Sequence, residues 1–311
     1  MFSDTIVTRN QQIHSNLLQE KNIELWIKRE DEIHPYVSGN KYRKLKYNIQ
    51  KAKEEGHTTV LTFGGAFSNH IVATSVACKQ SGLKSIGIIR GDELAINFEK
   101  VLQENNTLKE AHANGMQFYF VDRITYREKH SKEFLEKLKA EFGDFYVVPE
   151  GGTNDLAIKG CEEILIEEDE KFDYICAAVG TGGTISGLIN SAQNHQNIIG
   201  FPALKGSFLV EKIQKLTSKT QDWNLNLDYH FGGYAKYNIE LIRFINQFKE
   251  LHNVLLDPVY TGKMLFGIFD LIENNFFEKG SKILAIHTGG LQGIDGINKK
   301  LRKRNLELIK K

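Results

Sequence analysis

A lysine at the start of a predicted helix is the residue of this sequence best suited to covalent chemistry. Asn40 can cap the helix predicted over 41–54, so Lys41 falls in the first turn. The positive end of the helix dipole disfavours an ammonium ion there, which lowers the cost of the neutral amine that a nucleophilic lysine needs. The alternative is a solvated lysine in a basic helix, and this is the interpretation we favour for Lys44 and Lys46.

A loop rich in glycine and threonine is the second candidate for chemistry. It follows an apolar strand pattern over 174–179 and opens a helix pattern, and its residues are Gly180, Thr181, Gly182, Gly183 and Thr184. Glycines let the backbone approach a ligand closely, and free N–H groups at a helix start bind anions. Ile185 stands where a dinucleotide-binding fingerprint needs glycine, and the lysine of a P-loop is absent. The loop therefore predicts a cradle for one phosphate group, with a tight strand–helix turn as the alternative.

Three polar side chains gather at the start of another predicted helix. Ser68, Asn69 and His70 follow a strand pattern that ends in Gly64 and Gly65. Their hydrogen-bonding groups, together with the free N–H groups of a helix start, suit a carboxylate. The serine is not the nucleophile elbow of a hydrolase, because the G-x-S-x-G spacing is missing. Simple helix capping is the alternative.

Two later motifs add a tyrosine and a threonine to these groups. Tyr260 lies in the run Asp-Pro-Val-Tyr-Thr-Gly-Lys at a turn before a helix, and Thr288 lies in His-Thr-Gly-Gly after the last strand pattern. In open α/β sheets, ligands bind beyond the carboxyl ends of the strands. We therefore expect all these motifs to converge on one edge of the fold. No H-E-x-x-H motif or tight Cys/His cluster occurs in the sequence, and we expect no metal.

The elements that must position these residues alternate between strand and helix. This order predicts parallel sheets with right-handed crossovers, and continuous apolar runs predict strands buried on both faces. Strands are expected at 23–28, 59–63, 85–89, 117–121, 145–148, 174–179, 198–201, 228–231 and 282–286. Helices are expected, among other places, at 41–54, 69–80, 129–141, 155–166 and 238–251. The segment 47–150 holds several strand–helix units, and we interpret it as a second lobe inserted within the chain.

Composition and charge exclude several classes of protein. The 311 residues carry 40 Lys and Arg against 39 Asp and Glu, and this net charge of +1 offers no electrostatic footprint for nucleic acid. No apolar stretch reaches the ~18–20 residues of a membrane span. Met1–Asp4 carry no secretory signal, and three cysteines without a C-x-x-C pair suit a reducing compartment. We therefore expect a cytoplasmic protein that binds neither nucleic acid nor membrane.

The order of the motifs resembles one known family. G-N-K-x-R-K-L, G-G-x-x-S-N-H, G-T-G-G-T, D-P-V-Y-x-G-K and H-T-G-G follow one another within residues 23–293. Together they resemble the 1-aminocyclopropane-1-carboxylate deaminase / D-cysteine desulfhydrase family, pyridoxal-phosphate enzymes of the tryptophan-synthase β type. The resemblance implies an α/β fold with two lobes, three αβα layers and twisted, mostly parallel sheets. Residues 1–46 and 151–311 would form the large cofactor-binding lobe and residues 47–150 the small lobe, and the protein would be a homodimer.

The resemblance also implies which residues hold the cofactor. Lys41 would form the Schiff base with pyridoxal phosphate and move the α-proton of the substrate. The loop 180–184 would hold the phosphate group. Asn69 would bond the ring hydroxyl, and Thr288 would contact the pyridine nitrogen.

On the substrate side, the resemblance implies a small amino acid as the partner. Ser68, Asn69 and His70 would bind its carboxylate, with Ser68 also near the reacting atoms. Tyr260 would face the substrate as an acid–base or positioning group. The implied activity is that of a lyase or hydrolase of amino-acid metabolism.

The sequence departs from the family's deaminases at one informative position. Where they resemble Tyr-Glu-Gly, this chain has His287-Thr288-Gly289. A carboxylate keeps the pyridine nitrogen protonated, whereas a hydroxyl leaves the ring a weaker electron sink, and opening a cyclopropane ring should need the strong sink. We therefore expect α,β-elimination of D-cysteine to pyruvate, hydrogen sulfide and ammonia. The alternatives are a deaminase that gives 2-oxobutyrate and ammonia, and a pyridoxal-phosphate-binding protein with little catalysis.

Overall fold

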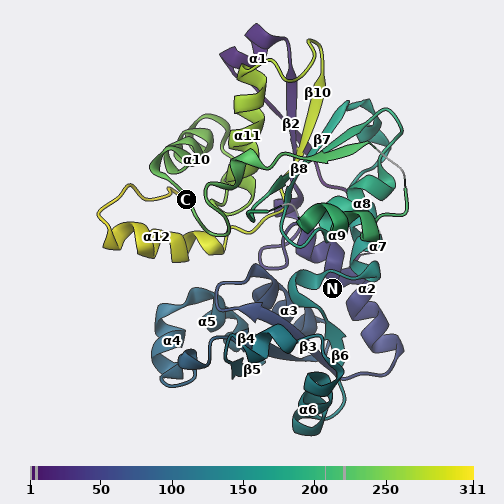
Figure 1. The fold of residues 1–311 in the computed structure, drawn as a ribbon, viewed down its shortest axis with the longest axis vertical. Coiled ribbons are helices and arrows are strands. Elements are labelled where there is room, and N and C mark those ends of the chain that lie inside the picture. The colour runs from purple at the N-terminus through teal and green to yellow at the C-terminus, as the bar shows by residue number, and fades with distance from the viewer. Residues whose placement is uncertain (1, 4–5, 207, 220–221) are drawn as a thin grey trace.

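The computed structural model describes residues 2–3, 6–206, 208–219 and 222–311. Met1 and Asp4, which belong to the opening segment considered for a secretory signal, lie outside the described residues. So do positions 5, 207 and 220–221 of the predicted large lobe. The described chain forms two separate sheets, one in the upper half and one in the lower half of Figure 1.

The larger sheet is built from strands at both ends of the sequence. Its order is β1 (Asn10–Ile13), β2 (Glu24–Lys28), β10 (Lys282–Ile286), β7 (Tyr174–Val179), β8 (Asn197–Pro202) and β9 (Trp223–Leu225). β1 pairs antiparallel with β2, and all other neighbours are parallel. The carboxyl ends of β2, β10, β7 and β8 therefore meet at one edge of the sheet. The strands predicted at 174–179 and 282–286 are confirmed to the residue.

The smaller sheet is parallel throughout. Its order is β5 (Met116–Val121), β4 (Lys84–Arg90), β3 (Thr59–Gly65) and β6 (Tyr146–Val148). The predicted α/β fold with mostly parallel sheets is confirmed. Because these four strands all fall within 47–150, we propose this segment as the small lobe, and 1–46 with 151–311 as the large lobe.

Helices connect nearly all of these strands. The α-helices are α1 (Asn16–Lys21), α2 (Asn40–Glu54), α3 (Asn69–Gln80), α4 (Phe98–Glu104), α5 (Asn106–Ala113), α6 (Lys132–Phe142), α7 (Asp155–Glu162), α8 (Gly183–Ser191), α9 (Phe208–Leu216), α10 (Ile239–His252), α11 (Thr261–Glu273) and α12 (Gly293–Lys303). Short 3₁₀ helices lie at Glu30–Glu32, Asp92–Leu94, Thr125–Glu128, Glu150–Gly152, Glu167–Lys171 and Asp228–His230.

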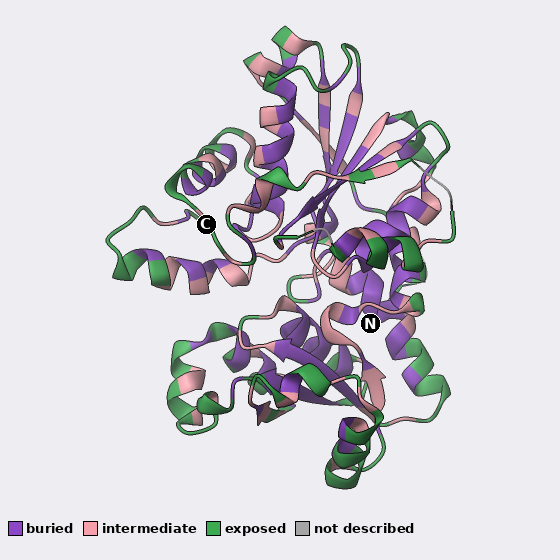
Figure 2. Cartoon of the chain, in the orientation of Figure 1, coloured by how far each residue is buried: buried purple, intermediate pink, exposed green. Residues whose placement is uncertain are grey.

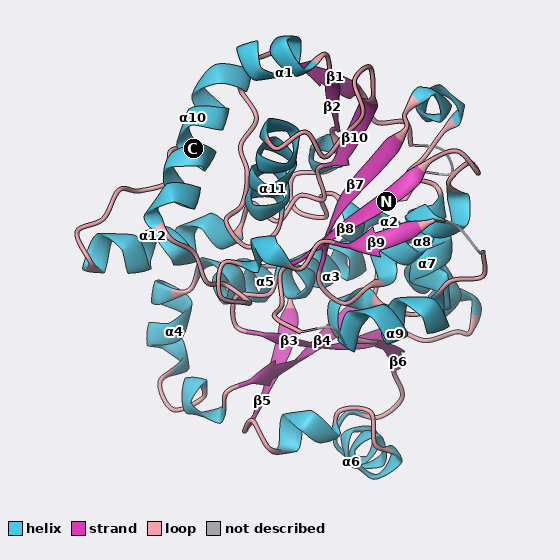
Figure 3. Ribbon diagram, turned by 45° about the horizontal axis from the view of Figure 1, so that its top comes forward, coloured by secondary structure: helices cyan, strands magenta, loops and turns pink. Residues whose placement is uncertain are grey.

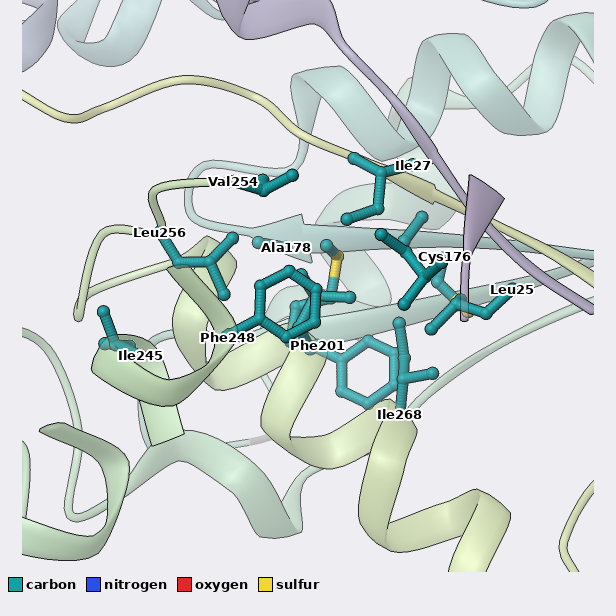
Figure 4. Packing of buried hydrophobic residues seen from close by; sticks show 14 of the residues in the cluster. Leu25, Ile27, Cys176, Ala178, Phe201, Ile245, Phe248, Val254, Leu256 and Ile268 are labelled. Carbon is teal, nitrogen blue, oxygen red and sulfur yellow. The ribbon is translucent and has the colours of Figure 1, made fainter. Parts of the chain in front are cut away.

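Side chains of the larger sheet alternate between two hydrophobic clusters, one on each face. On β7, Cys176 and Ala178 belong to the cluster shared with α10, α11 and α12, part of which Figure 4 draws. Ile175, Ala177 and Val179 belong to the cluster shared with α7, α8 and α9. The period of two therefore puts helices on both faces, and Figure 3 shows the sheet between them. The interior strands of both sheets are buried over most of their length (Figure 2).

α2 joins the two halves of the molecule and presents the region around Lys41. Tyr42, Leu45 and Ile49 pack into a cluster with apolar residues of β3 and α3, and another side of the helix packs against α7. The interpretation of Lys44 and Lys46 as solvated lysines was wrong, because both are buried. Because α2 is covered on two sides, fewer of its charged residues are exposed to solvent than the charge pattern predicts.

Two predicted elements differ most from the structure. Residues 228–231 were predicted as a strand but form the 3₁₀ helix Asp228–His230, and Phe231 then takes a φ of 53°, which no strand accommodates. β9 forms the edge of the sheet in that region instead. The helix predicted over 155–166 ends at Glu162. β1 was not predicted because its sequence, Asn-Gln-Gln-Ile, has no apolar alternation.

Candidate active site

One cavity of the described chain gathers the motifs singled out from the sequence. It lies where the carboxyl edge of the larger sheet faces the first turns of α2 and α3. The predicted site residues that line it are Lys41, Ser68, Asn69, His70, Gly180, Thr181, Gly182, Thr184, Tyr260 and Thr288. Gly183 is not part of the lining but is the first residue of α8. The structure thus brings the motifs together, and the chemical role of each residue stays a prediction.

The start of α2 brings Lys41 to the cavity. Gly39 is the N-cap, with a φ of 59°. A Cβ on this residue would lie 2.1 Å from the carbonyl oxygen of Thr288, so only glycine lets α2 approach the end of β10 this closely. The prediction that Asn40 caps the helix was wrong. Its Nδ2 instead donates to Thr184 Oγ1 at 2.8 Å, which ties α2 to the start of α8.

The environment of Lys41 favours its neutral form. The side chain is half-buried, and its Nζ donates to Asn40 Oδ1 at 3.2 Å. Burial penalises the ammonium ion and the Lys44 cation adds repulsion, which together lower the pKa of Lys41 from 10.5 to about 7. About half of the molecules therefore carry the neutral amine at neutral pH, as a nucleophilic lysine requires.

The loop after β7 and a buried lysine form a place for an anion. Gly182 is the N-cap of α8, with a φ of 95°, and offers no side-chain cap, so the first N–H groups of α8 are open to a ligand. Lys44 points to the same spot, because a Cβ on Gly183 would lie 3.3 Å from its Nζ. That Nζ also donates to Gly151 O at 3.3 Å and to Thr153 Oγ1 at 3.2 Å. An anion here would meet both a helix N-terminus and a cation.

The start of α3 carries polar groups that the fold itself does not use. Ser68 is the N-cap residue, but its side chain makes no capping hydrogen bond. This observation removes the capping alternative considered for Ser68. Asn69 donates from Nδ2 to Gly290 O at 3.2 Å, and its buried Oδ1 has no hydrogen-bond partner in the described chain. A ligand in the cavity can therefore bond both side chains.

His70 is held as a neutral imidazole. Its pKa lies well below the usual value because the ring is buried and faces the cations Lys41 and Lys44. Thr62 Oγ1 donates to a backbone carbonyl at 2.8 Å, so it must accept at 2.8 Å from the Nε2–H of His70. Nδ1 is then an unprotonated acceptor, and it has no partner in the described chain. His70 can thus accept a hydrogen bond but offers no positive charge to a carboxylate.

Tyr260 stands at the start of α11, where a buried aspartate fixes its backbone. Asp257 is 1% exposed, and its Oδ1 accepts from the N–H groups of Val259 and Tyr260, each at 2.8 Å. Its Oδ2 accepts from the N–H and hydroxyl of Thr261 at 2.9 and 2.8 Å. Burial, and then the interaction with the hydroxyl of Tyr234, raise the pKa of Tyr260 well above its usual value. Tyr260 is therefore a neutral phenol that can donate a proton.

The end of β10 presents a threonine to the cavity and turns a histidine away from it. Thr288 is nearly buried and lines the cavity. His287 is fully buried and is not part of the lining. Its Nε2 donates to Leu255 O at 2.7 Å, and its Nδ1 accepts from the N–H of Gly289 at 3.2 Å. Both ring nitrogens of His287 are therefore used by the backbone.

Lys44 and Tyr234 are among the lining residues that the sequence did not predict. Lys44 was taken for a surface residue, and only the burial of α2 reveals its position. Tyr234 lines the cavity beside Tyr260. The one available signal for Tyr234 was the glycine pair at 232–233 that precedes it.

These residues fit pyridoxal phosphate, the cofactor expected from the motifs. Its phosphate matches the start of α8 with Lys44, and its carbonyl group matches the amine of Lys41. Its ring hydroxyl matches the unpartnered Oδ1 of Asn69, and its ring nitrogen matches a hydroxyl such as that of Thr288. Each part of the cofactor thus has a complementary group in the cavity lining or beside it.

The described residues contain neither a candidate membrane-spanning helix nor a candidate metal site. No helix there has the length and apolar character needed to cross a membrane. No group of three or more His, Cys, Asp or Glu side chains in those residues is arranged to hold a metal ion.

Comparisons with known proteins identify the family of this chain. Residues 6–289 match the family described as pyridoxal-phosphate dependent enzyme. A bifunctional D-cysteine desulfhydrase/1-aminocyclopropane-1-carboxylate deaminase of Arabidopsis thaliana is 32% identical over 295 residues, which cover 87% of this chain and 73% of the plant protein. D-cysteine desulfhydrase of Klebsiella pneumoniae is 28% identical over 288 residues, which cover 86% of this chain and 87% of that protein.

A solved structure has the same overall fold. The crystal structure of an ACC deaminase homologue superimposes with a TM-score of 0.77 at 29% sequence identity, and the match covers 96% of this chain and 94% of the other. At this coverage the likeness spans both sheets.

Proposed function

Because the chain belongs to the family of pyridoxal-phosphate-dependent enzymes, we propose that it breaks down a small amino acid by α,β-elimination, with D-cysteine as its main substrate. The C–S bond and the Cα–H bond of the substrate break, and the sulfur leaves as hydrogen sulfide. One D-cysteine and one water give one pyruvate, one hydrogen sulfide and one ammonia, so the reaction needs no oxidant or reductant.

We choose D-cysteine over 1-aminocyclopropane-1-carboxylate because the cavity presents the hydroxyl of Thr288, and not a carboxylate, at the end of β10. When bound, pyridoxal phosphate withdraws electron density from the α-carbon of the substrate, most strongly when its ring nitrogen is protonated. A neutral hydroxyl cannot stabilise that proton as a carboxylate does. His287 does not replace a carboxylate either, because both of its ring nitrogens bond the backbone. A substrate with an α-proton and a good leaving group suits this environment better than an aminocyclopropane does.

We assign the cofactor-binding roles to the residues that converge on the cavity. The N–H groups at the start of α8, from the loop 180–184, hold the phosphate together with Lys44. Asn69 bonds the ring hydroxyl, Thr288 faces the ring nitrogen, and Lys41 binds the carbonyl group.

Lys41 and Tyr260 are the residues we assign to proton transfer. The neutral amine of Lys41 takes the α-proton of the substrate, and the protonated phenol of Tyr260 donates toward the leaving sulfur. Ser68 and the N–H groups of Asn69 and His70 at the start of α3 bind the substrate carboxylate. The side chain of His70, being neutral, acts as an acceptor in this arrangement rather than as the cation.

A substrate panel tests this function. Purified protein loaded with the cofactor is given D-cysteine, L-cysteine or 1-aminocyclopropane-1-carboxylate, and sulfide and the 2-oxo acid are measured. We expect sulfide and pyruvate from D-cysteine, with Lys41→Ala protein as the blank. 2-Oxobutyrate from the aminocyclopropane substrate without sulfide from D-cysteine would establish the deaminase instead. If the protein bound the cofactor but formed no product from any of the three substrates, it would be a pyridoxal-phosphate-binding protein with little catalysis.

Replacing Lys44 with methionine should weaken cofactor binding. Charge-assisted hydrogen bonds contribute about 1.5–3 kcal/mol, so the dissociation constant should rise by about ten- to a hundredfold. Titration of the apoprotein with pyridoxal phosphate, followed by absorbance, measures this change. Lys46→Met is the matched control, since Lys46 lies on the same helix but pairs with Glu163 at 2.9 Å. If the two variants bound pyridoxal phosphate with equal affinity, Lys44 would not belong to the phosphate site.

Cofactor capture by the apoprotein should depend on pH through Lys41. Its reactive form is the neutral amine, so the rate should rise with pH through about 7, the pKa of Lys41, and level off above it. From pH 6 to pH 8 the neutral fraction rises from about one tenth to about nine tenths. The rate at which visible absorbance appears after mixing measures the profile. A rate that kept rising tenfold per pH unit above pH 8 would mean that Lys41 keeps its ordinary pKa.

We also propose that the enzyme acts as a homodimer in the cytoplasm. The dimer is supported by the family resemblance, and the compartment by the three cysteines, which are all free and buried. Sedimentation of the loaded protein tests the dimer, with a monomer as the contrary result.

A further inference from the structure

The backbone just before Ser68 is held by a buried asparagine from another part of the chain. Asn105 ends α4, caps α5 and is 6% exposed. Its Nδ2 donates to the carbonyl oxygen of Ala66 at 2.9 Å, and its Oδ1 accepts from the N–H of Leu108 at 3.1 Å. Because a carbonyl can only accept and an N–H can only donate, these two partners fix the orientation of the amide group. Asn105 therefore joins the start of α5 to the loop that carries Ser68.

The two neighbours of Asn105 are bound to α12. Glu104 pairs with Lys299 at 3.1 Å, and Nδ2 of Asn106 donates to Oδ2 of Asp295 at 3.2 Å. The two partners on α12 are four residues apart, so they share one face of that helix. Figure 1 shows α12, from the upper half of the molecule, beside α5 of the lower half. Asn105 thus stands between two residues that are both tied to another helix.

The loop around Ser68 contacts the same region of the chain directly. Phe67 lies against Gly296 of α12, where a Cβ would be 3.1 Å from Cδ1 of the ring and 3.3 Å from Cε1. On the other side of Ser68, Nδ2 of Asn69 donates to Gly290 O at 3.2 Å. The residues on both sides of Ser68 are therefore held, while the hydroxyl of Ser68 makes no capping hydrogen bond. This arrangement suits a hydroxyl that must meet a ligand at a fixed place.

We propose that Asn105 is a positioning residue, and that its hydrogen bond to Ala66 holds Ser68 where the substrate carboxylate binds. This inference rests on the proposed function in one respect, the role of Ser68. Asn105 is not part of the cavity lining, so it acts through the backbone of the loop and not on the substrate itself. Without this bond the loop would have to be ordered when the substrate binds, and that ordering costs binding free energy.

Steady-state kinetics of Asn105→Ser test the proposal. Serine keeps a neutral N-cap for α5, but its hydroxyl takes the place of Cγ and is one bond too short to replace the amide nitrogen. We expect KM to rise by about three- to tenfold with kcat within about twofold, because the lost hydrogen bond supports substrate binding and not the chemical step. Asn97→Ser is the matched control, since Asn97 is exposed and caps α4 by accepting from the N–H of Lys100 at 3.3 Å.

Ser68→Ala separates this proposal from the proposed function. A raised KM in Ser68→Ala with an unchanged KM in Asn105→Ser would overturn the positioning role and leave the role of Ser68 standing. An unchanged KM in Ser68→Ala would overturn both roles, because the carboxylate would then bind elsewhere. The kinetics use D-cysteine, or 1-aminocyclopropane-1-carboxylate where only that is turned over, so failure of the substrate assignment leaves the test intact.

Hydrogen exchange of the apoprotein gives a readout that needs no turnover. The N–H of Ser68 bonds Gly65 O at 3.0 Å, and the N–H of Ile71 bonds Ser68 O at 3.1 Å. We expect Asn105→Ser to speed exchange in the peptide that covers 65–71, while Asn97→Ser leaves it unchanged. If exchange in this peptide were the same in Asn105→Ser as in the wild type, Asn105 would not hold the loop, whatever the enzyme turns over.

Discussion

Lys41→Ala protein will lack the visible absorbance of the bound cofactor and will turn over D-cysteine at least about 10³-fold more slowly than the wild type. Lys41 is the amine that the fold delivers to the cavity in a state ready to react, since its pKa is lowered to about 7 by burial and by Lys44. Alanine removes both the group that binds the cofactor carbonyl and the group that takes the α-proton. Absorbance spectra and pyruvate formation measure the two losses separately.

The control for this variant comes from the same helix. Lys51→Ala removes a half-exposed lysine near the far end of α2, whose partner is Glu55 at 3.3 Å. It should keep the spectrum and the rate within about twofold, because a surface ion pair contributes little. If Lys41→Ala kept the absorbance while remaining folded, another amine would have to bind the cofactor.

The parts of the fold that the sequence predicts best are those where local pattern and burial agree. β7 is an unbroken apolar run because it is covered on both faces, and its bounds follow directly from that run. β1 and β9 lie at the edges of the sheet, where pairing on one side stabilises sequences without a clear pattern. These two strands are therefore the ones that the sequence predicts least well, whereas the apolar edge strands β5 and β6 of the smaller sheet were predicted.

The residues of the candidate site also differ in how well the sequence predicts them. Residues carried by a motif, such as Lys41, Ser68 and Tyr260, could be named from the sequence because glycines and helix starts surround them. Lys44 and Tyr234 could not, since each depends on contacts with segments far away in the sequence. Lys44 meets Gly151 and Thr153 only after α2 packs between the two sheets. A charge pattern along one helix contains no information about that packing.

His70 illustrates a different limit, because its position was predicted but its charge was not. The ring is neutral because it is buried and because Lys41 and Lys44 lie nearby, and the hydrogen bond with Thr62 places its one proton on Nε2. None of these neighbours can be inferred from the local run around His70. The residue type alone therefore suggests a cation for the substrate carboxylate, where the structure offers an acceptor.

Tyr260→Phe will lower kcat by about 10²-fold or more while leaving cofactor binding intact. The phenol is partly buried, and its pKa is held well above the usual value, so Tyr260 keeps its proton throughout the neutral pH range and acts as a donor, not as a base. Phenylalanine keeps the ring between Gly180 and Tyr234 and removes only the hydroxyl. The visible absorbance should therefore match the wild type, in contrast to Lys41→Ala.

The kinetic signature of Tyr260→Phe distinguishes proton donation from substrate binding. A group that acts in the transition state lowers kcat and kcat/KM together, whereas a group that only holds the substrate raises KM at constant kcat. We expect the first result with D-cysteine. A raised KM with unchanged kcat would make Tyr260 a wall of the substrate pocket, and the proton for the leaving sulfur would have to come from another donor.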